Sequence, residues 1–296
     1  MSSRWSFAAL LRPTAHAPRR AVTMLRAVVA IVLLTHPLYM FTHADAMRDL
    51  ASRLAEWGVP WALGFAWIAA ACVMVSAALL LAARFVFPAA LMAASFVAAA
   101  ALLFHAPYWY VVGGGADVDH PGVELHVLLL VGLGATAWMA WRDGAGQGDR
   151  SAEEALSVAR VGPAAMILAH ALYPFVLWDL AGMRDFGQEM EHIGFPFGGV
   201  LVWCIVTTQA LSSFALLAKR FVVPACLGHL VVLGNGLWIA HAGRWFVVGP
   251  GRDGMEYSVL YIACFTGVLV TYWPRRAAGA AAGRLATASR EVAAVI

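Results

Sequence analysis

Eight stretches of about 20 mostly apolar residues dominate this sequence and leave few folds open to it. A run of about 18 or more apolar residues is long enough to cross the hydrocarbon core of a membrane as a helix. Hydrophobic residues make up 62% of the 296-residue chain and charged residues only 12%. That composition excludes a soluble enzyme, a disordered chain and a nucleic-acid-binding protein, because one soluble core cannot bury so much apolar surface. We therefore predict an all-α integral membrane protein with eight transmembrane helices in contact with the lipid bilayer.

Charges, glycines or prolines bound each predicted span. The spans cover residues 21–44, 60–82, 85–105, 122–141, 159–178, 197–218, 221–242 and 255–273. The first span follows a basic flank, as a signal peptide does, but its apolar part is longer than the 7–15 residues, roughly, of a signal sequence. We interpret it as a helix that stays in the protein.

Basic residues are unevenly distributed between the two ends of the spans. If both termini are cytoplasmic, 15 of the 20 Lys and Arg residues lie inside and 5 outside, while most acidic residues lie near the outer face. This distribution follows the positive-inside rule. Lys219 is the only lysine beside 19 arginines, and with the Ala-rich segments this indicates GC-rich coding. We expect an integral protein of a bacterial inner membrane with both termini in the cytoplasm.

The two halves of the chain resemble each other at one constant offset, which places Arg84 on Arg220. Residues 84–91 match residues 220–227 at six of eight positions, and the offset continues without a gap from Met47 to Asp117. Each unit holds four spans, an even number, so the two units have the same orientation. We predict two parallel-repeat four-helix bundles, residues 21–141 and 159–273. Residues 142–158 form a cytoplasmic linker, and residues 1–20 and 274–296 form cytoplasmic terminal segments.

Histidine and glutamate recur toward the outer ends of the spans in both units. A charge at the centre of a membrane costs about 2.5–3.5 kcal/mol, so ionisable residues there are informative. The residues with a counterpart in the other unit are His36, His105 and Glu124, matched by His170, His241 and Glu256. We expect each set of three to converge within its own bundle. A neutral imidazole can bind a metal or a quinone carbonyl, and a nearby carboxylate can orient it or exchange protons.

Structural roles would also explain these residues. A Glu in the first turn of a helix is favoured by the helix dipole, and a His at a membrane interface can simply make hydrogen bonds. Other residues are weaker candidates for a site because they lack a repeated partner or a motif. They are His43, His120, His126, His192 and His229, and four cysteines inside spans without CxxC spacing, Cys72, Cys204, Cys226 and Cys264.

Four short motifs occur in the same order in both units. They are a Gly-x-Pro start of the second span, an Arg-x-x-x-Pro-Ala turn before the third, a His at its outer end and a Gly-x-Glu opening of the fourth. In this order the motifs resemble the DoxX family, over residues 26–141 and again over 161–273. The resemblance implies a redox-associated membrane subunit that interacts with quinone or an electron carrier, and with a redox partner protein. One departure is that residues 64–76 and 200–212 lack the Glu that family members often carry on the second helix.

Three functions stay open at this point. The first is the redox-associated subunit, with quinone as the leading cofactor and haem or a transition metal as weaker ones. Haem ligation would use His36 with His170, or His105 with His241. The second is a non-enzymatic membrane receptor or assembly scaffold. The third is a small-solute or metal transporter. Among acidic and histidine residues, however, only His229 lies in the inner half of a span, which leaves an ion relay incomplete.

Overall fold

A computed structural model describes residues 16–105, 123–176, 180–239, 245–246 and 254–273. Every regular element in these ranges is a helix. In chain order the helices are α2 (Ala17–Thr42), α3 (Ala44–Glu56), α4 (Ala62–Leu81), α5 (Val86–Ala100), the π-helix η1 (Ala101–His105), α6 (Glu124–Gly144), α7 (Gly148–Val176), α8 (Ala181–His192), α9 (Gly198–Leu217), α10 (Val222–Ile239) and α11 (Glu256–Tyr272).

Seven helices within the described ranges are long and apolar enough to cross a membrane. They include α2, α4, α6, α7, α9 and α10, and α5 together with η1. The eighth predicted span corresponds to α11, which is apolar but has 17 residues. The structure thus supports an all-α integral membrane protein, with one predicted span represented by a shorter helix.

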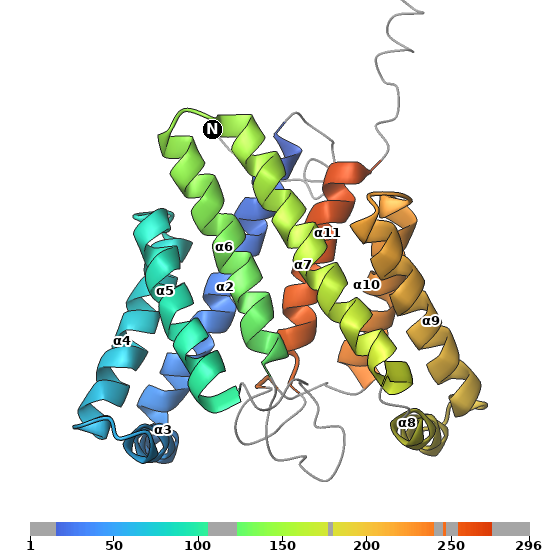
Figure 1. The fold of residues 1–296 in the computed structure, drawn as a ribbon, viewed down its shortest axis with the longest axis horizontal. Coiled ribbons are helices and arrows are strands. Elements are labelled where there is room, and N and C mark those ends of the chain that lie inside the picture. Colours follow the sequence, from blue (N-terminus) through green and yellow to red (C-terminus); the bar gives the residue numbers. More distant parts are fainter. Residues whose placement is uncertain (1–15, 106–122, 177–179, 240–244, 247–253, 274–296) are drawn as a thin grey trace, which may run out of the picture.

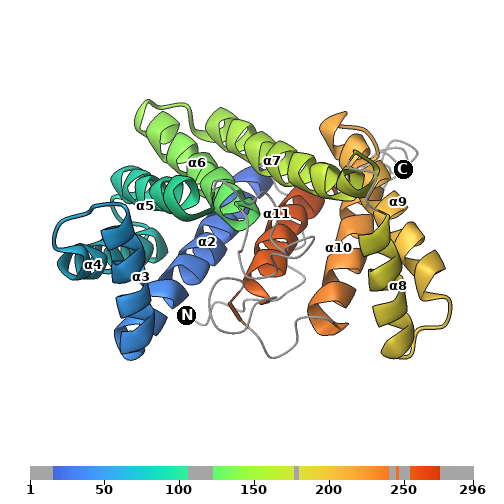
Figure 2. The same ribbon diagram turned by 60° about the horizontal axis from the view of Figure 1, so that its bottom comes forward.

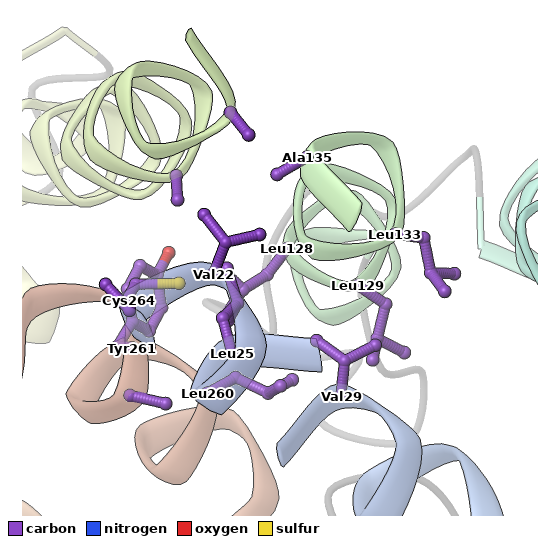
Figure 3. Packing of buried hydrophobic residues seen from close by; sticks show 14 of the residues in the cluster. Val22, Leu25, Val29, Leu128, Leu129, Leu133, Ala135, Leu260, Tyr261 and Cys264 are labelled. Carbon is purple, nitrogen blue, oxygen red and sulfur yellow. The ribbon is translucent and has the colours of Figure 1, made fainter. Parts of the chain in front are cut away.

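Four helices form the centre of the molecule. The helix α2 packs against α11 and α6 packs against α7, while α3 to α5 lie on one side of this centre and α8 to α10 on the other (Figures 1 and 2). Aliphatic side chains fill the centre, because an apolar stripe on each helix can be buried only against another helix. Figure 3 shows Val22 and Leu25 of α2 between Leu128 of α6 and Tyr261 of α11, all of them fully or almost fully buried.

The flanking helices expose apolar side chains on their outward faces. Leu63 and Ile68 of α4 and Val200 and Leu211 of α9 are examples. A soluble protein rarely leaves such continuous apolar surface exposed. These faces are therefore suited to contact lipid.

Two short helices, α3 and α8, lie across the ends of the long helices at the same end of the molecule, where Figure 1 shows both end-on. Met47, Ala51 and Leu54 of α3 are buried. On α8 the buried residues are Met183, Gly187 and Met190. The opposite faces carry the charged residues, which makes both helices amphipathic. Neither helix was predicted from the sequence, and the first predicted span ended at Ala44, whereas α2 ends at Thr42 and Ala44 already belongs to α3.

Among the described residues, non-glycine residues with positive φ occur at three places in each half of the chain. They occupy equivalent positions when the two halves of the sequence are aligned. The equivalent residues are Trp61 and Phe197, Ala83 and Lys219, and Phe85 and Phe221. L-residues rarely adopt this conformation, and holding one in it costs about 1–3 kcal/mol. The helices that follow therefore start with the same unusual backbone turn in both halves.

A cluster of polar residues joins three helices at the end opposite α3 and α8. Both terminal guanidinium nitrogens of Arg19 on α2 donate to the carboxylate of Asp143 on α6, at 2.5 and 2.9 Å. The hydroxyl of Ser151 on α7 donates to the same carboxylate at 2.6 Å. Only residues 145–147 separate α6 from α7, so most of the predicted linker is helical.

Candidate functional site

A histidine and a glutamate from opposite halves of the chain meet near the end that carries α3 and α8. Nε2 of His36 lies 2.8 Å from Oε2 of Glu256, which opens α11. The Glu256 side chain is fully buried, whereas the His36 side chain is 30% exposed. Edge-on packing of His36 against Phe246, with ring centroids 5.4 Å apart, fixes the orientation of the imidazole. The imidazole thus connects a buried carboxylate with the surface of the helix bundle.

Glu124 takes part in a second pair of the same kind. Its Oε2 lies 3.6 Å from Nδ1 of His170 on α7. The side chain of Glu124 is 3% exposed and that of His170 is 39% exposed. A buried carboxylate again faces an imidazole that reaches the surface. Burying a carboxylate is costly unless partners stabilise its charge, so each pair compensates an otherwise unfavourable group.

Two tyrosines of α11 complete the second pair. The hydroxyl groups of Tyr257 and Tyr261 both donate hydrogen bonds to Oε1 of Glu124, that of Tyr261 at 3.1 Å. Their spacing of four residues places both rings on one face of α11. Glu124 thus receives donors on one oxygen from α11 and faces His170 with the other. Neither tyrosine was among the site residues predicted from the sequence.

These pairings differ from the expected arrangement. We predicted that His36 would converge with Glu124, and His170 with Glu256, within single bundles. The structure instead pairs His36 of the first half with Glu256 of the second, and His170 of the second half with Glu124 of the first. The physical reason is that α2 packs against α11 and α7 against α6, so each first helix meets the last helix of the other half.

His105 and His126 form a separate histidine pair in the first half. His105 ends the π-helix η1 and His126 lies in the first turn of α6, and their ring centroids are 4.3 Å apart. Both are buried, with exposed fractions of 5% and 8%. Single π-helical turns inside α-helices are often found at functional sites. His126 was a weaker candidate in the sequence because it lacks a repeated partner.

The remaining predicted site residue, His241, lies outside the described residues. Near its position in the chain, the indole nitrogen of Trp245 donates to the hydroxyl of Thr35 at 2.9 Å. The carbonyl of Trp245 accepts a hydrogen bond from the backbone nitrogen of Glu256 at 3.2 Å. These two contacts connect α2 to the start of α11 beside the His36–Glu256 pair.

One histidine lies in the interior away from both pairs. His229 on α10 is fully buried, its Nε2 is 3.2 Å from the hydroxyl of Ser213, and its ring stacks on Phe265 with centroids 4.5 Å apart. Phe265 stacks in turn on Tyr261 at 6.0 Å. A row of rings therefore leads from Glu124 along α11 into the interior.

The four His and Glu residues of the two pairs can bind a hydrogen-bonding ligand and exchange protons with it. A neutral imidazole that donates to the carboxylate has an acceptor as its other ring nitrogen, whereas a protonated imidazole has a second N–H donor there. Within the described ranges, no group of three or more His, Cys, Asp and Glu residues is placed to hold a metal ion. Each pair by itself offers one imidazole and one carboxylate, which suits an organic hydrogen-bond acceptor.

Comparisons of the chain with family models, with characterised proteins and with solved structures give no match.

Proposed function

We propose that this chain is a DoxX-like protein of the bacterial inner membrane, made of two parallel four-helix units with eight spans in total. The repeat that places Arg84 on Arg220 and the paired positive-φ turns at the same offset support two units. In this arrangement α11 is the eighth span, and α3 and α8 lie on the outer surface of the membrane. Both termini are cytoplasmic, in accord with the excess of Arg in the segments next to that end of the spans.

Its proposed role is that of a redox-associated subunit that exchanges protons with a quinone or an electron carrier at the outer face. The observation that carries this role is the pairing of a buried carboxylate with a partly exposed imidazole, found twice. A quinone carbonyl accepts a hydrogen bond, and a partly exposed imidazole can donate one from the edge of the bundle. Reduction of a quinone to a quinol takes up two electrons and two protons.

The chain's own residues would supply the proton part of this reaction. In its protonated form the imidazole donates one N–H to the quinone carbonyl and the other to the carboxylate, which stabilises the charged ring until the first proton is transferred. The electrons would come from a partner protein. An apolar environment strengthens both hydrogen bonds, because water does not compete for donors and acceptors there.

The test measures quinone binding to the protein purified in lipid nanodiscs. A short-chain ubiquinone analogue is titrated while tryptophan fluorescence is recorded. We expect His36→Ala combined with His170→Ala to weaken binding at least tenfold. His43→Ala is the matched control, since His43 lies at the end of α2 outside both pairs, and it should leave binding unchanged. Quinone extraction from the untreated protein gives an independent readout.

No binding to the wild-type protein, or equal binding by the double variant, would contradict the proposal. Co-purifying proteins and an unimpaired double variant would then favour the membrane receptor or assembly scaffold. Metal-dependent uptake into vesicles would favour a transporter.

The proposed orientation has its own test. In a cysteine-free background, Glu56→Cys at the end of α3 should react with a membrane-impermeant maleimide in intact spheroplasts. Gln147→Cys between α6 and α7 should react only after the membrane is opened. The reverse pattern would contradict an outer location of the two pairs.

A further inference from the structure

Tyr257 and Tyr261 both contact one buried carboxylate. Both hydroxyls donate to the same oxygen of Glu124. The two rings are nearly perpendicular, at 83°, with centroids 4.7 Å apart. Tyr261 is fully buried, and Tyr257, one turn nearer the end of the molecule, is partly exposed. An outside molecule can therefore approach Tyr257 but not Tyr261.

The two tyrosines begin a continuous series of aromatic contacts, Tyr257, Tyr261, Phe265 and His229, which we name the aromatic ladder. Successive ring centroids are 4.7, 6.0 and 4.5 Å apart. Three members recur every fourth residue on α11, so they cover about 12 Å along the helix at 1.5 Å per residue. The ladder connects the carboxylate of Glu124 with the interior at His229.

Packing alone does not require these aromatic residues. Glu124 and Glu256 occupy equivalent positions when the two halves are aligned. In this alignment the first half has three buried leucines at the positions of the ladder residues of α11. These leucines are Leu125, Leu129 and Leu133. In place of His229 the first half has Ala93, which is also fully buried. The same kind of helix packing is thus achieved with aliphatic side chains alone.

The ladder is suited to carry an electron and not a proton. Phe265 has no exchangeable proton, so a hydrogen-bonded proton path would end at Tyr261. Phenols can be oxidised by one electron when a base accepts the phenolic proton at the same time. The carboxylate of Glu124, held at hydrogen-bond distance, is such a base.

We propose that Tyr257 and Tyr261 are a redox-active tyrosine pair with Glu124 as its proton acceptor. In the step, the O–H bond of one phenol breaks, its proton forms an O–H bond with Oε1 of Glu124, and one electron leaves to a high-potential one-electron oxidant, such as an organic radical or a metal complex ion. The products are a neutral tyrosyl radical, a protonated Glu124 and the reduced oxidant. Return of an electron and of the proton restores the phenol.

The experiment generates the oxidant by light and does not depend on quinone. Purified protein in nanodiscs is illuminated with a ruthenium tris-bipyridine complex and a sacrificial acceptor, frozen, and examined by electron paramagnetic resonance. Growth with ring-deuterated tyrosine narrows a tyrosyl signal and distinguishes it from a tryptophan radical. We expect a tyrosyl signal that falls at least fivefold in Tyr257→Phe combined with Tyr261→Phe.

Three further variants keep the test decisive. Glu124→Gln keeps a hydrogen-bond acceptor but no base, and should lower the radical yield about as much as the double tyrosine variant. Tyr39→Phe and Tyr272→Phe, outside the ladder, should keep the wild-type yield. Thermal unfolding shows that each variant is folded. An unchanged yield in the double variant or in Glu124→Gln, or a loss confined to the two control variants, would overturn the proposal whether or not quinone binds.

Discussion

The interiors of the two halves differ at corresponding positions although their helices follow the same order. The second half has Tyr257, Tyr261 and Phe265 on α11, where the first half has three leucines on α6. It also has Ser213 and His229, where the first half has Ala77 and Ala93. All these residues except Tyr257 are at least nine-tenths buried. The difference teaches that aliphatic side chains are sufficient to pack these positions in the first half, so close packing alone does not account for the polar and aromatic residues of the second half.

A second difference lies where the short helices cross the long ones. Gly187 of α8 lies against Gly198 and Gly199 of α9 so closely that a Cβ on Gly198 would overlap the carbonyl oxygen of Gly187. At the corresponding positions the first half has Ala51 and Ala62. The α8–α9 crossing is therefore tighter than the α3–α4 crossing.

The largest effect should come from Gly198→Ala. The new methyl group meets backbone, which cannot move aside as a side chain can, so we expect a loss of about 3 kcal/mol in the free energy of unfolding. The reverse change in the first half, Ala62→Gly, should cost about 1 kcal/mol at most. Thermal unfolding in detergent measures both. Equal effects would contradict the difference between the two crossings.

The next effect concerns the phenols at Glu124. Replacing Tyr257 and Tyr261 together by Phe removes two donors from a buried carboxylate, and should lower the free energy of unfolding by about 2 kcal/mol, since hydrogen bonds to charged groups are worth more than neutral ones. Tyr272→Phe is the control and should change it by less than about 0.5 kcal/mol. If the double variant unfolds like the control, the phenols do not stabilise Glu124.

A smaller effect is expected for the Ser213–His229 contact. Ser213→Ala should lower the free energy of unfolding by about 1 kcal/mol, because the buried Nε2 of His229 loses its partner. In a double-mutant cycle with His229→Phe, which keeps a ring on Phe265, most of this cost should disappear. Ala77→Ser in the first half, where Ala93 offers no partner, should bring no stability. Additive effects in the cycle would show that the contact does not contribute.

The smallest effect distinguishes the solvent faces of α3 and α8. On α3 the guanidinium of Arg53 donates to Asp49 at 3.1 Å, one turn apart, whereas α8 has Asp185 and Glu189 at the corresponding positions. Glu189→Arg should replace a repulsion by an ion pair and raise the free energy of unfolding by about 0.5 kcal/mol. Added salt should reduce this gain, because exposed charges are screened. A salt-independent gain would point to a different cause.

The sequence predicted the long helices well because the bilayer fixes their length. The predicted span 197–218 corresponds to α9 at Gly198–Leu217, and 60–82 corresponds to α4 at Ala62–Leu81. It did not predict α3 and α8, although Met47, Ala51 and Leu54 have the three-to-four-residue spacing of an amphipathic helix. The charged residues of these stretches fit the acidic outer face predicted from the sequence, and they obscure the apolar periodicity.

The candidate site was only partly predictable. The high cost of charge in a membrane and the repeat pointed to His36, Glu124, His170 and Glu256, and the structure brings these four together in pairs. Which glutamate meets which histidine depends on how the two halves pack, and no local pattern encodes that. Selecting residues by their repetition also removed those that distinguish the halves, above all the tyrosines of α11.

Crosslinking tests the central claim, that each pair is built from both halves, most directly. In a cysteine-free background a protease site is inserted at Gly146, between α6 and α7, and cysteines are placed at two positions of the four. A short thiol-to-thiol crosslinker is added, the chain is cut, and fragment sizes are read on a denaturing gel. Cysteines replacing His36 and Glu256, or His170 and Glu124, should hold the fragments together at full length. Cysteines replacing Glu56 on α3 and Glu189 on α8 also lie on different fragments, but these helices are on opposite sides of the centre, so this control should leave two half-length fragments. Separate fragments from His36 with Glu256 and from His170 with Glu124, or full-length product from the control as readily as from these pairs, would contradict the account.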